Sequence, residues 1–175
     1  MHNPRPRVLL ALCALAAMVG CEPTNQGYEP TQPIQYSHAL HAGTRQIPCQ
    51  YCHYDAERSR HAGIPAAEVC MNCHSQVLTE SPEIQRLRGY IERGEPIPWE
   101  RVHRLPDFVY FNHSWHIEAG RQCAECHGPI EQMARVRQDQ PLTMGWCLDC
   151  HRQHNATQPP GSEQIASTDC SACHY

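Results

Sequence analysis

The sequence Cys49-Gln50-Tyr51-Cys52-His53 is the first of five copies of a Cys-x-x-Cys-His motif. The other copies begin at Cys70, Cys123, Cys147 and Cys170. This spacing is the attachment signature of c-type haem. Two thiols three positions apart can add to the two vinyl groups of one porphyrin, and the histidine that follows can reach the iron from one face. The motifs therefore predict five covalently bound haem c groups.

The motifs account for ten of the 12 cysteines. The predicted haem-bearing cysteines are Cys49, Cys52, Cys70, Cys73, Cys123, Cys126, Cys147, Cys150, Cys170 and Cys173. The predicted proximal iron ligands are His53, His74, His127, His151 and His174. Zinc is an alternative, because paired Cys-x-x-Cys knuckles make four-thiolate zinc sites. An odd number of knuckles, each followed by a histidine, argues against zinc, and no cysteine remains for a disulfide framework.

Residues 1–20 have the pattern of a secretory signal peptide, with Arg5 and Arg7 before an apolar run too short to span a bilayer. The run ends Met18-Val19-Gly20-Cys21, which resembles a bacterial lipobox and predicts lipidation of Cys21. The alternative is an ordinary signal peptide with an unmodified Cys21. Haem c is attached outside the cytoplasm, so either reading predicts export. We expect a protein anchored by lipid at the periplasmic face of a membrane, the inner membrane being favoured over the outer.

Composition predicts a chain that cannot build its own core. Only 22 of the 155 residues from Cys21 onward are Val, Leu, Ile or Phe, which is about 14% and below the roughly 20% typical of folded domains. We therefore expect a stack of haems to form the core, wrapped by a mainly irregular chain with short α-helices. The net charge is −4 and there is no lysine, so the sequence offers no basic patch for nucleic acid.

An internal repeat divides the chain. Tyr36-Ser37-His38-Ala39-Leu40-His41 and Phe111-Asn112-His113-Ser114-Trp115-His116 share the pattern aromatic-x-His-x-x-His, and each precedes haem motifs. The repeat predicts a dihaem module at 36–100 and a trihaem module at 101–175. The polar, proline-rich residues 21–35 are predicted to be the lipidated N-terminus and a tether.

The clearest helix signal lies near the end of the first module. Ser81 and Pro82 are typical of a helix start, an apolar stripe follows, and Gly94 is a plausible stop. Shorter helices are expected near 66–74 and 143–152, an extended segment at 107–111 and a loop at 155–168.

Seven histidines after Cys21 lie outside the motifs and are candidates for the sixth ligand of the irons. The His-x-x-His pairs resemble those of class III cytochromes c, the cytochrome c3 and c7 group. That resemblance implies that His38 serves the haem at Cys49, His41 the haem at Cys70, His113 the haem at Cys123, and His116 the haem at Cys147.

The last haem, at Cys170, has no obvious partner. In the c7 pattern its ligand precedes the motif before it, where this chain has Met144. Met144, His154, His103 and His61 are therefore the candidates. His61 could also replace His41, and His103 could reach across the modules. A Met/His haem has a higher reduction potential than a bis-His haem.

Two segments, WERVHRLPDFVYF (99–111) and PLTMGWCLDCHR (141–152), resemble the pentahaem cytochrome c subunit of alternative complex III. The resemblance implies an electron-carrying subunit, not itself an enzyme, of a quinol-oxidising membrane complex. Its partners would be an iron–sulfur, molybdopterin-like subunit and a monohaem cytochrome c, and its electrons would pass to a downstream cytochrome or terminal oxidase.

Two other functions remain alternatives. A free-standing multihaem shuttle or extracellular wire would need the same motifs. A catalytic multihaem reductase is less favoured, because it needs an iron with an open position, whereas no motif here is altered and the candidate ligands outnumber the irons.

Overall fold

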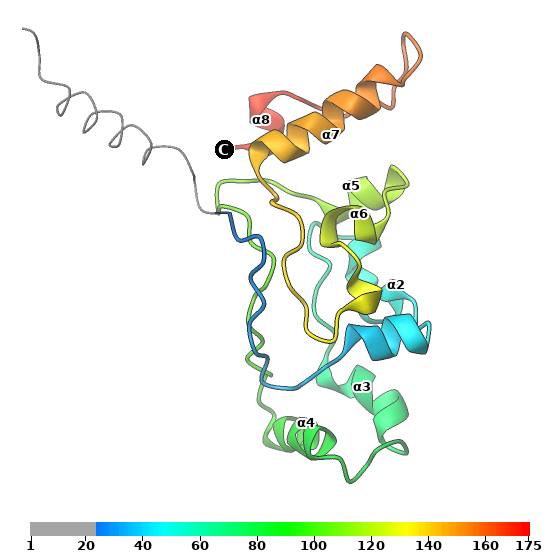
Figure 1. The fold of residues 1–175 in the computed structure, drawn as a ribbon, viewed down its shortest axis with the longest axis vertical. Coiled ribbons are helices and arrows are strands. Elements are labelled where there is room, and N and C mark those ends of the chain that lie inside the picture. The colour runs from blue at the N-terminus through cyan, green and yellow to red at the C-terminus, as the bar shows by residue number, and fades with distance from the viewer. Residues whose placement is uncertain (1–23) are drawn as a thin grey trace, which may run out of the picture.

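The computed structural model describes residues 24–175, so the predicted signal peptide and Cys21 lie outside the described residues. Short helices joined by irregular segments form an elongated body (Figure 1). The elements are the π-helix η1 (Ala39–Thr44), α2 (Cys49–Cys52), the 3-10 helix η2 (Tyr54–Glu57), α3 (Ala67–His74), α4 (Pro82–Arg93), α5 (His113–Glu118), α6 (Cys123–His127), the 3-10 helix η3 (Ile130–Gln132), α7 (Met144–Ala156) and α8 (Cys170–Cys173). The predicted fold class, mainly irregular with short α-helices, is confirmed.

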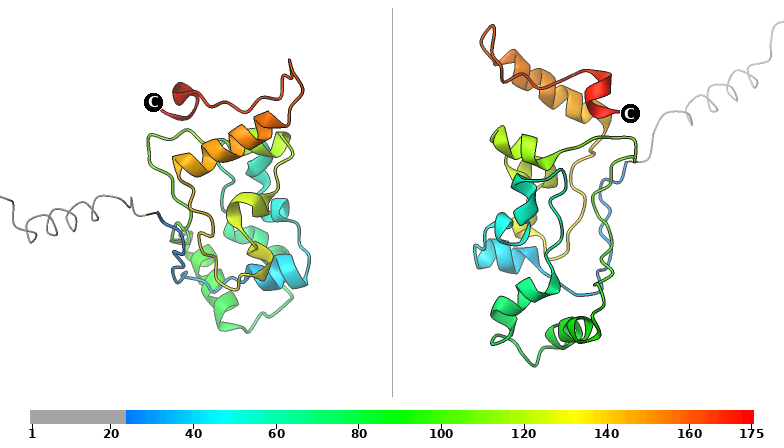
Figure 2. Two further views of the ribbon diagram at one scale, coloured as in Figure 1. Left: turned by 45° about the horizontal axis from the view of Figure 1, so that its top comes forward. Right: turned by 180° about the vertical axis from the view of Figure 1, so that it is seen from behind.

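The helices are spread along the long axis of the body. In Figure 1, α3 and α4 lie at one end, α2 and α6 in the middle, and α7 and α8 at the other end. The segments before η1 and between α4 and α5 run along one side, as the view from behind in Figure 2 also shows. Extended backbone in the described residues pairs at a single bridge, between Val109 and His174. None of the described helices is long and apolar enough to cross a membrane.

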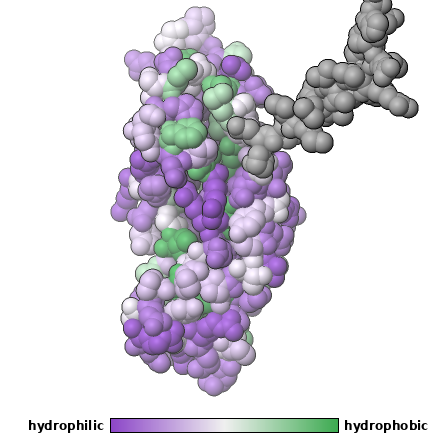
Figure 3. All heavy atoms as spheres, turned by 90° about the vertical axis from the view of Figure 1, so that its left-hand side faces the viewer, coloured by the Kyte–Doolittle hydropathy of each residue, from purple (hydrophilic) through white to green (hydrophobic). Residues whose placement is uncertain are grey.

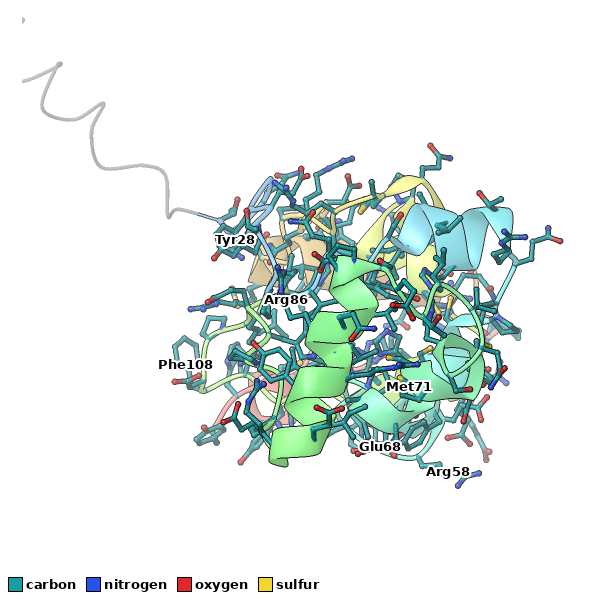
Figure 4. All side chains as sticks on the ribbon, turned by 90° about the horizontal axis from the view of Figure 1, so that it is seen from below. Tyr28, Arg58, Glu68, Met71, Arg86 and Phe108 are labelled. Atoms are coloured by element: carbon teal, nitrogen blue, oxygen red, sulfur yellow. The ribbon has the colours of Figure 1, made fainter. Side chains whose placement is uncertain are left out.

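The helix α4 begins and ends where the sequence predicts. Ser81 is extended before Pro82, and Gly94 closes the helix with a left-handed backbone at φ 62° and ψ 27°. Its inner face buries Ile84 and Leu87 against Ile34 from the N-terminal segment. Figure 4 looks onto this end of the body, where Arg86 projects from α4 and donates to the carbonyl of Pro33 at 3.0 Å. Each fully buried aliphatic side chain contributes about 1.5–3 kcal/mol, so this cluster helps to hold α4 against the N-terminal segment.

The other two predicted helices are also present. The helix α3 occupies Ala67–His74, and α7 runs from Met144 to Ala156, four residues beyond the predicted end. The side chain of Thr143 accepts the backbone N–H of Trp146 at 3.3 Å and caps the start of α7. The segment that follows Ala156 is irregular up to α8.

The segment predicted to be a tether is held against the body from Asn25 onward. The Asn25 amide donates to the carbonyl of Val102 at 2.7 Å, and the Gly27 N–H donates to the carbonyl of Gln138 at 2.7 Å. Gln138 is fully buried, and its side-chain oxygen accepts the Arg104 N–H at 3.2 Å. Hydrogen bonds from Asn25 and Gly27 therefore join this N-terminal segment to the segments around Val102 and Gln138. Composition alone does not reveal these contacts.

The polypeptide has little apolar interior of its own. Its buried hydrophobic residues within 24–175 are Ile34, Ala56, Ile84, Leu87, Val102 and Met133. Figure 3 shows hydrophobic residues as scattered patches on a largely hydrophilic face. This matches the shortage of apolar residues in the sequence.

Candidate haem sites

Each Cys-x-x-Cys-His motif forms a helical turn, and the sites are numbered 1 to 5 in chain order. The turns belong to α2, α3, α6, α7 and α8. Residues three apart on a helix are neighbours on one face, so each turn presents its two thiols together. No disulfide joins these ten motif cysteines, so each is available for a thioether bond to haem.

Three predicted ligand pairs face each other at a spacing that fits an iron atom. The ring centres are 6.1 Å apart for His41 and His74, 6.3 Å for His113 and His127, and 6.2 Å for His116 and His151. Two imidazole–metal bonds of about 2 Å, with about 1 Å from each nitrogen to its ring centre, require about 6 Å. The pairs belong to sites 2, 3 and 4, and the donors present there fit haem iron.

At site 1 the predicted pair is His38 and His53. Burial lowers the pKa of His38 to about 4, with nearby His53 and His41 adding to the effect, so the ring is neutral. Its Nδ1 atom is buried and has no hydrogen-bond partner. The Nδ1 atom of His53 lies 2.8 Å from the carbonyl of Gly63.

Backbone carbonyls orient most of these histidines. A carbonyl only accepts, so the facing Nδ1 carries the proton and Nε2 keeps the lone pair that a metal needs. The contacts are His41 to Ser37, His53 to Gly63, His74 to Val77, His113 to Arg60, His116 to Asn112 and His151 to Ser167, at 2.6–2.9 Å. The fold therefore selects the tautomer in which Nε2 is the ligand atom.

The sequence repeat has a counterpart in the ring geometry. Tyr36 stacks on His41 with centres 4.3 Å apart and meets His38 edge-on at 4.8 Å. Phe111 stacks on His116 at 4.5 Å and meets His113 edge-on at 4.8 Å. The aromatic residue of each unit thus sets the angle between its two histidines.

The remaining candidate ligands are placed differently. His61 is exposed, and the Nε2 atom of His154 lies 2.9 Å from the carbonyl of Gln164. Met144 is the first residue of α7 and is 65% exposed. At site 5, the aromatic neighbour of His174 is Phe108, with ring centres 5.6 Å apart.

His103 lies against a proximal ligand. Its Nε2 atom is 3.2 Å from the Nδ1 atom of His127. Burial lowers the pKa of both rings, that of His127 to about 3, with the neighbouring histidines adding to the effect. Nothing in the spacing of residues 103 and 127 indicates this contact, because no motif or helical period links them.

The five sites follow one another along the body in the order 2, 1, 3, 4, 5. Their helices α3, α2 and α6 are met in this order along the long axis in Figure 1, and α7 and α8 lie side by side at the far end. Neighbouring thiols support the same order. Burial raises the pKa of four of these thiols, and in each case a nearby cysteine of the adjacent site raises that pKa further. These pairs are Cys70 with Cys52, Cys123 with Cys49, Cys126 with Cys150, and Cys147 with Cys173.

The chain is similar to known multihaem cytochromes c. Residues 109–175 match the family model of cytochrome c7 and related cytochromes c. Over 164 residues the chain is 36% identical to the menaquinone reductase multihaem cytochrome c subunit of Nitratidesulfovibrio vulgaris strain Hildenborough, covering 82% of this chain and 76% of that protein. The chain belongs to this family of multihaem cytochromes c. The predicted c7-like character and the role of electron carrier are confirmed, and covalently bound haem c is the cofactor.

Proposed function

We propose that this cytochrome holds five haem c groups in one row and conducts electrons between a quinone-reactive membrane complex and a second redox protein. The observation that carries the proposal is the set of facing histidine pairs on motifs that neighbour one another from one end of the body to the other. Haem supplies one-electron exchange when bound. The chain supplies the ligands, the spacing and the surroundings that set each potential.

Four sites have bis-His ligation in this proposal. Their proximal ligands are His53, His74, His127 and His151, and their distal ligands are His38, His41, His113 and His116, in the order of sites 1 to 4. The protein should then contain five haems, each attached through two thioether bonds. Intact-protein mass spectrometry measures both the haem number and any lipid on Cys21, and four or fewer haems in fully processed protein would contradict the count.

Met144 is the proposed sixth ligand of site 5. It lies one helical turn before Cys147, and Cys147 neighbours Cys173 of site 5. Its thioether is exposed, whereas the Nε2 atom of His154 is engaged by Gln164. A methionine ligand raises the reduction potential of its haem. Electrons would therefore flow along the row toward site 5.

Absorption in the near infrared tests this ligand. The oxidised protein should show the weak sulfur-to-iron band, and Met144→Leu should abolish it while the bis-His EPR signals persist. A wild-type protein without the band excludes Met144 at site 5.

The complex would be membrane-bound, with the cytochrome at its periplasmic face. The related protein is named as a subunit of a menaquinone reductase, which supports a quinone-linked assembly. The sequence resemblance favours electrons leaving quinol, passing along the cytochrome and reaching a monohaem cytochrome or oxidase. An iron–sulfur, molybdopterin-like subunit would be its neighbour.

Tagged cytochrome isolated from gently solubilised membranes tests this assignment. We expect membrane subunits to co-purify, and menaquinol to reduce the haems in the complex but not in the isolated cytochrome. Isolation of the cytochrome alone, with direct exchange between it and soluble donors, would instead indicate a free-standing shuttle.

The reverse direction is the second candidate, and the name of the related protein favours it. In that case electrons would enter at the cytochrome and reduce menaquinone. The same complex decides between the two directions. If electrons flow to menaquinone, reduced haems should be reoxidised when menaquinone is added. Oxidised haems should then stay oxidised when menaquinol is added.

A further inference from the structure

Four proximal histidines have a described Nδ1 contact, and one of them differs from the other three in what this atom meets. His53, His74 and His151 face backbone carbonyls, whereas His127 faces the Nε2 atom of His103 at 3.2 Å. The two rings are nearly perpendicular, at 81°, with centres 4.4 Å apart. This geometry places a ring nitrogen of His103 in line with the edge of His127.

The chemistry of this contact follows from the ligand role of His127. If its Nε2 binds iron, its Nδ1 carries a proton and donates, so the Nε2 atom of His103 accepts and the His103 proton sits on Nδ1. An imidazole nitrogen is a stronger base than an amide carbonyl. It therefore draws the proton further from His127, makes that ring a more electron-rich ligand, and favours ferric over ferrous iron.

The surrounding chain holds the His103 ring in place. The preceding residue, Val102, is buried, and its carbonyl accepts the Asn25 amide at 2.7 Å. The following residue, Arg104, donates its backbone N–H to the buried side chain of Gln138. Both neighbours of His103 are thus fixed to other segments.

We propose that His103 is a positioning residue that orients His127 and lowers the reduction potential of the haem at Cys123 and Cys126. The inference rests on the proposed ligation of that haem by His127. Site 3 is the middle of the row 2, 1, 3, 4, 5, so every electron that travels between the ends passes it. The reduction potential of site 3 therefore determines the free-energy change of electron transfer between sites 1 and 3 and between sites 3 and 4.

The hydrogen bond can be tested in the unaltered, fully reduced protein, in which low-spin ferrous haem is diamagnetic. With 15N-labelled histidine, we expect a 15N–15N coupling across the bond between His127 and His103. Mass spectrometry of the peptide spanning residues 123–127 first establishes that haem is attached there. With haem attached, a missing coupling overturns the role of His103, whereas missing haem overturns the proposed ligation as well.

The effect on potential can be tested with His103→Leu and His103→Gln. At the wild-type midpoint of site 3, we expect His103→Leu to raise the ferrous-to-ferric ratio about tenfold, equal to about 59 mV for one electron. His103→Gln restores an amide acceptor and should give an intermediate ratio. The His113 and His127 rings are nearly parallel, at 8°, whereas the pairs at sites 2 and 4 are at 62° and 33°, so EPR should distinguish this haem from those two. The other four haems are internal controls.

Unchanged potentials at all five haems of His103→Leu would overturn the proposal. So would equal shifts in the leucine and glutamine variants, because repacking alone would then explain both. If neither variant folds, the coupling measured in the unaltered protein still decides.

Discussion

The two aromatic-x-His-x-x-His units reach the same ring arrangement on different backbones. In both, the aromatic ring stacks on the second histidine and meets the first edge-on. In both, the second histidine bonds the carbonyl four residues earlier, at 2.8 Å. Yet the first unit leads into the π-helix η1, and the second into the α-helix α5.

The first histidine of each unit shows the larger difference. His113 is held by the carbonyl of Arg60 at 2.8 Å, whereas the buried Nδ1 atom of His38 has no partner. The two units therefore share the aromatic ring and the carbonyl that orient their histidine rings. They differ in helix type and in the hydrogen-bond partner of the first histidine. Ligand geometry here depends on one aromatic ring and one carbonyl more than on helix type.

The largest expected effect comes from removing haem from both units at once. Residues 24–175 made without haem should lose their cooperative thermal transition in far-UV circular dichroism, because the chain buries few apolar side chains of its own. The haem-loaded protein is the control. A cooperative melt of the haem-free chain would show that the peptide holds the units together.

Removing the second histidine of each unit should affect one haem at a time. His41→Leu should leave site 2, and His116→Leu site 4, with a five-coordinate, high-spin iron that binds carbon monoxide. EPR spectroscopy and carbon monoxide titration measure this, each variant serving as the control for the other. A variant in which all five irons stay low-spin would have another distal ligand, such as His61 at site 2.

Truncating the stacked aromatic residue should destabilise both units similarly. Tyr36→Ala and Phe111→Ala each remove a half-buried ring that contacts two histidines, so we expect the free energy of unfolding to fall by about 2 kcal/mol. Denaturant titration of haem-loaded protein measures this. Tyr54→Ala, at an exposed ring, is the control and should change stability by no more than about 0.5 kcal/mol.

The smallest expected effect is a difference in stability loss when the capping side chain of each unit is removed. Asn112 accepts both the N–H and the hydroxyl of Ser114, so Asn112→Ala should cost about 1 kcal/mol. Ser37 accepts one N–H, from Leu40, at 3.2 Å in an exposed position, so Ser37→Ala should cost less. Equal losses in the same denaturant titration would argue against a difference in backbone support.

The sequence predicted what depends on neighbours along the chain. Ser81 and Gly94 mark the ends of α4, and the repeated pattern at Tyr36 and Phe111 predicted equivalent units. These features follow from local backbone preferences and from motif spacing.

Contacts between distant segments could not be predicted in the same way. The bond from His127 to His103 and the burial of Gln138 arise where segments meet in space, and a polar residue carries no periodic signal of burial. The π-helix at Ala39–Thr44 also lacks a sequence marker. The polar composition of residues 24–35 suggested a free tether, but their amides and carbonyls bond the body.

The contact between His113 and the Arg60 carbonyl also bears on how the protein is assembled. Ser114 reinforces it, because its N–H donates to the carbonyl of Ser59 at 3.2 Å. The carbonyl that orients a distal ligand of site 3 thus belongs to the N-terminal half of the chain, whereas site 3 itself lies in the C-terminal half. A C-terminal half made alone would lack this contact.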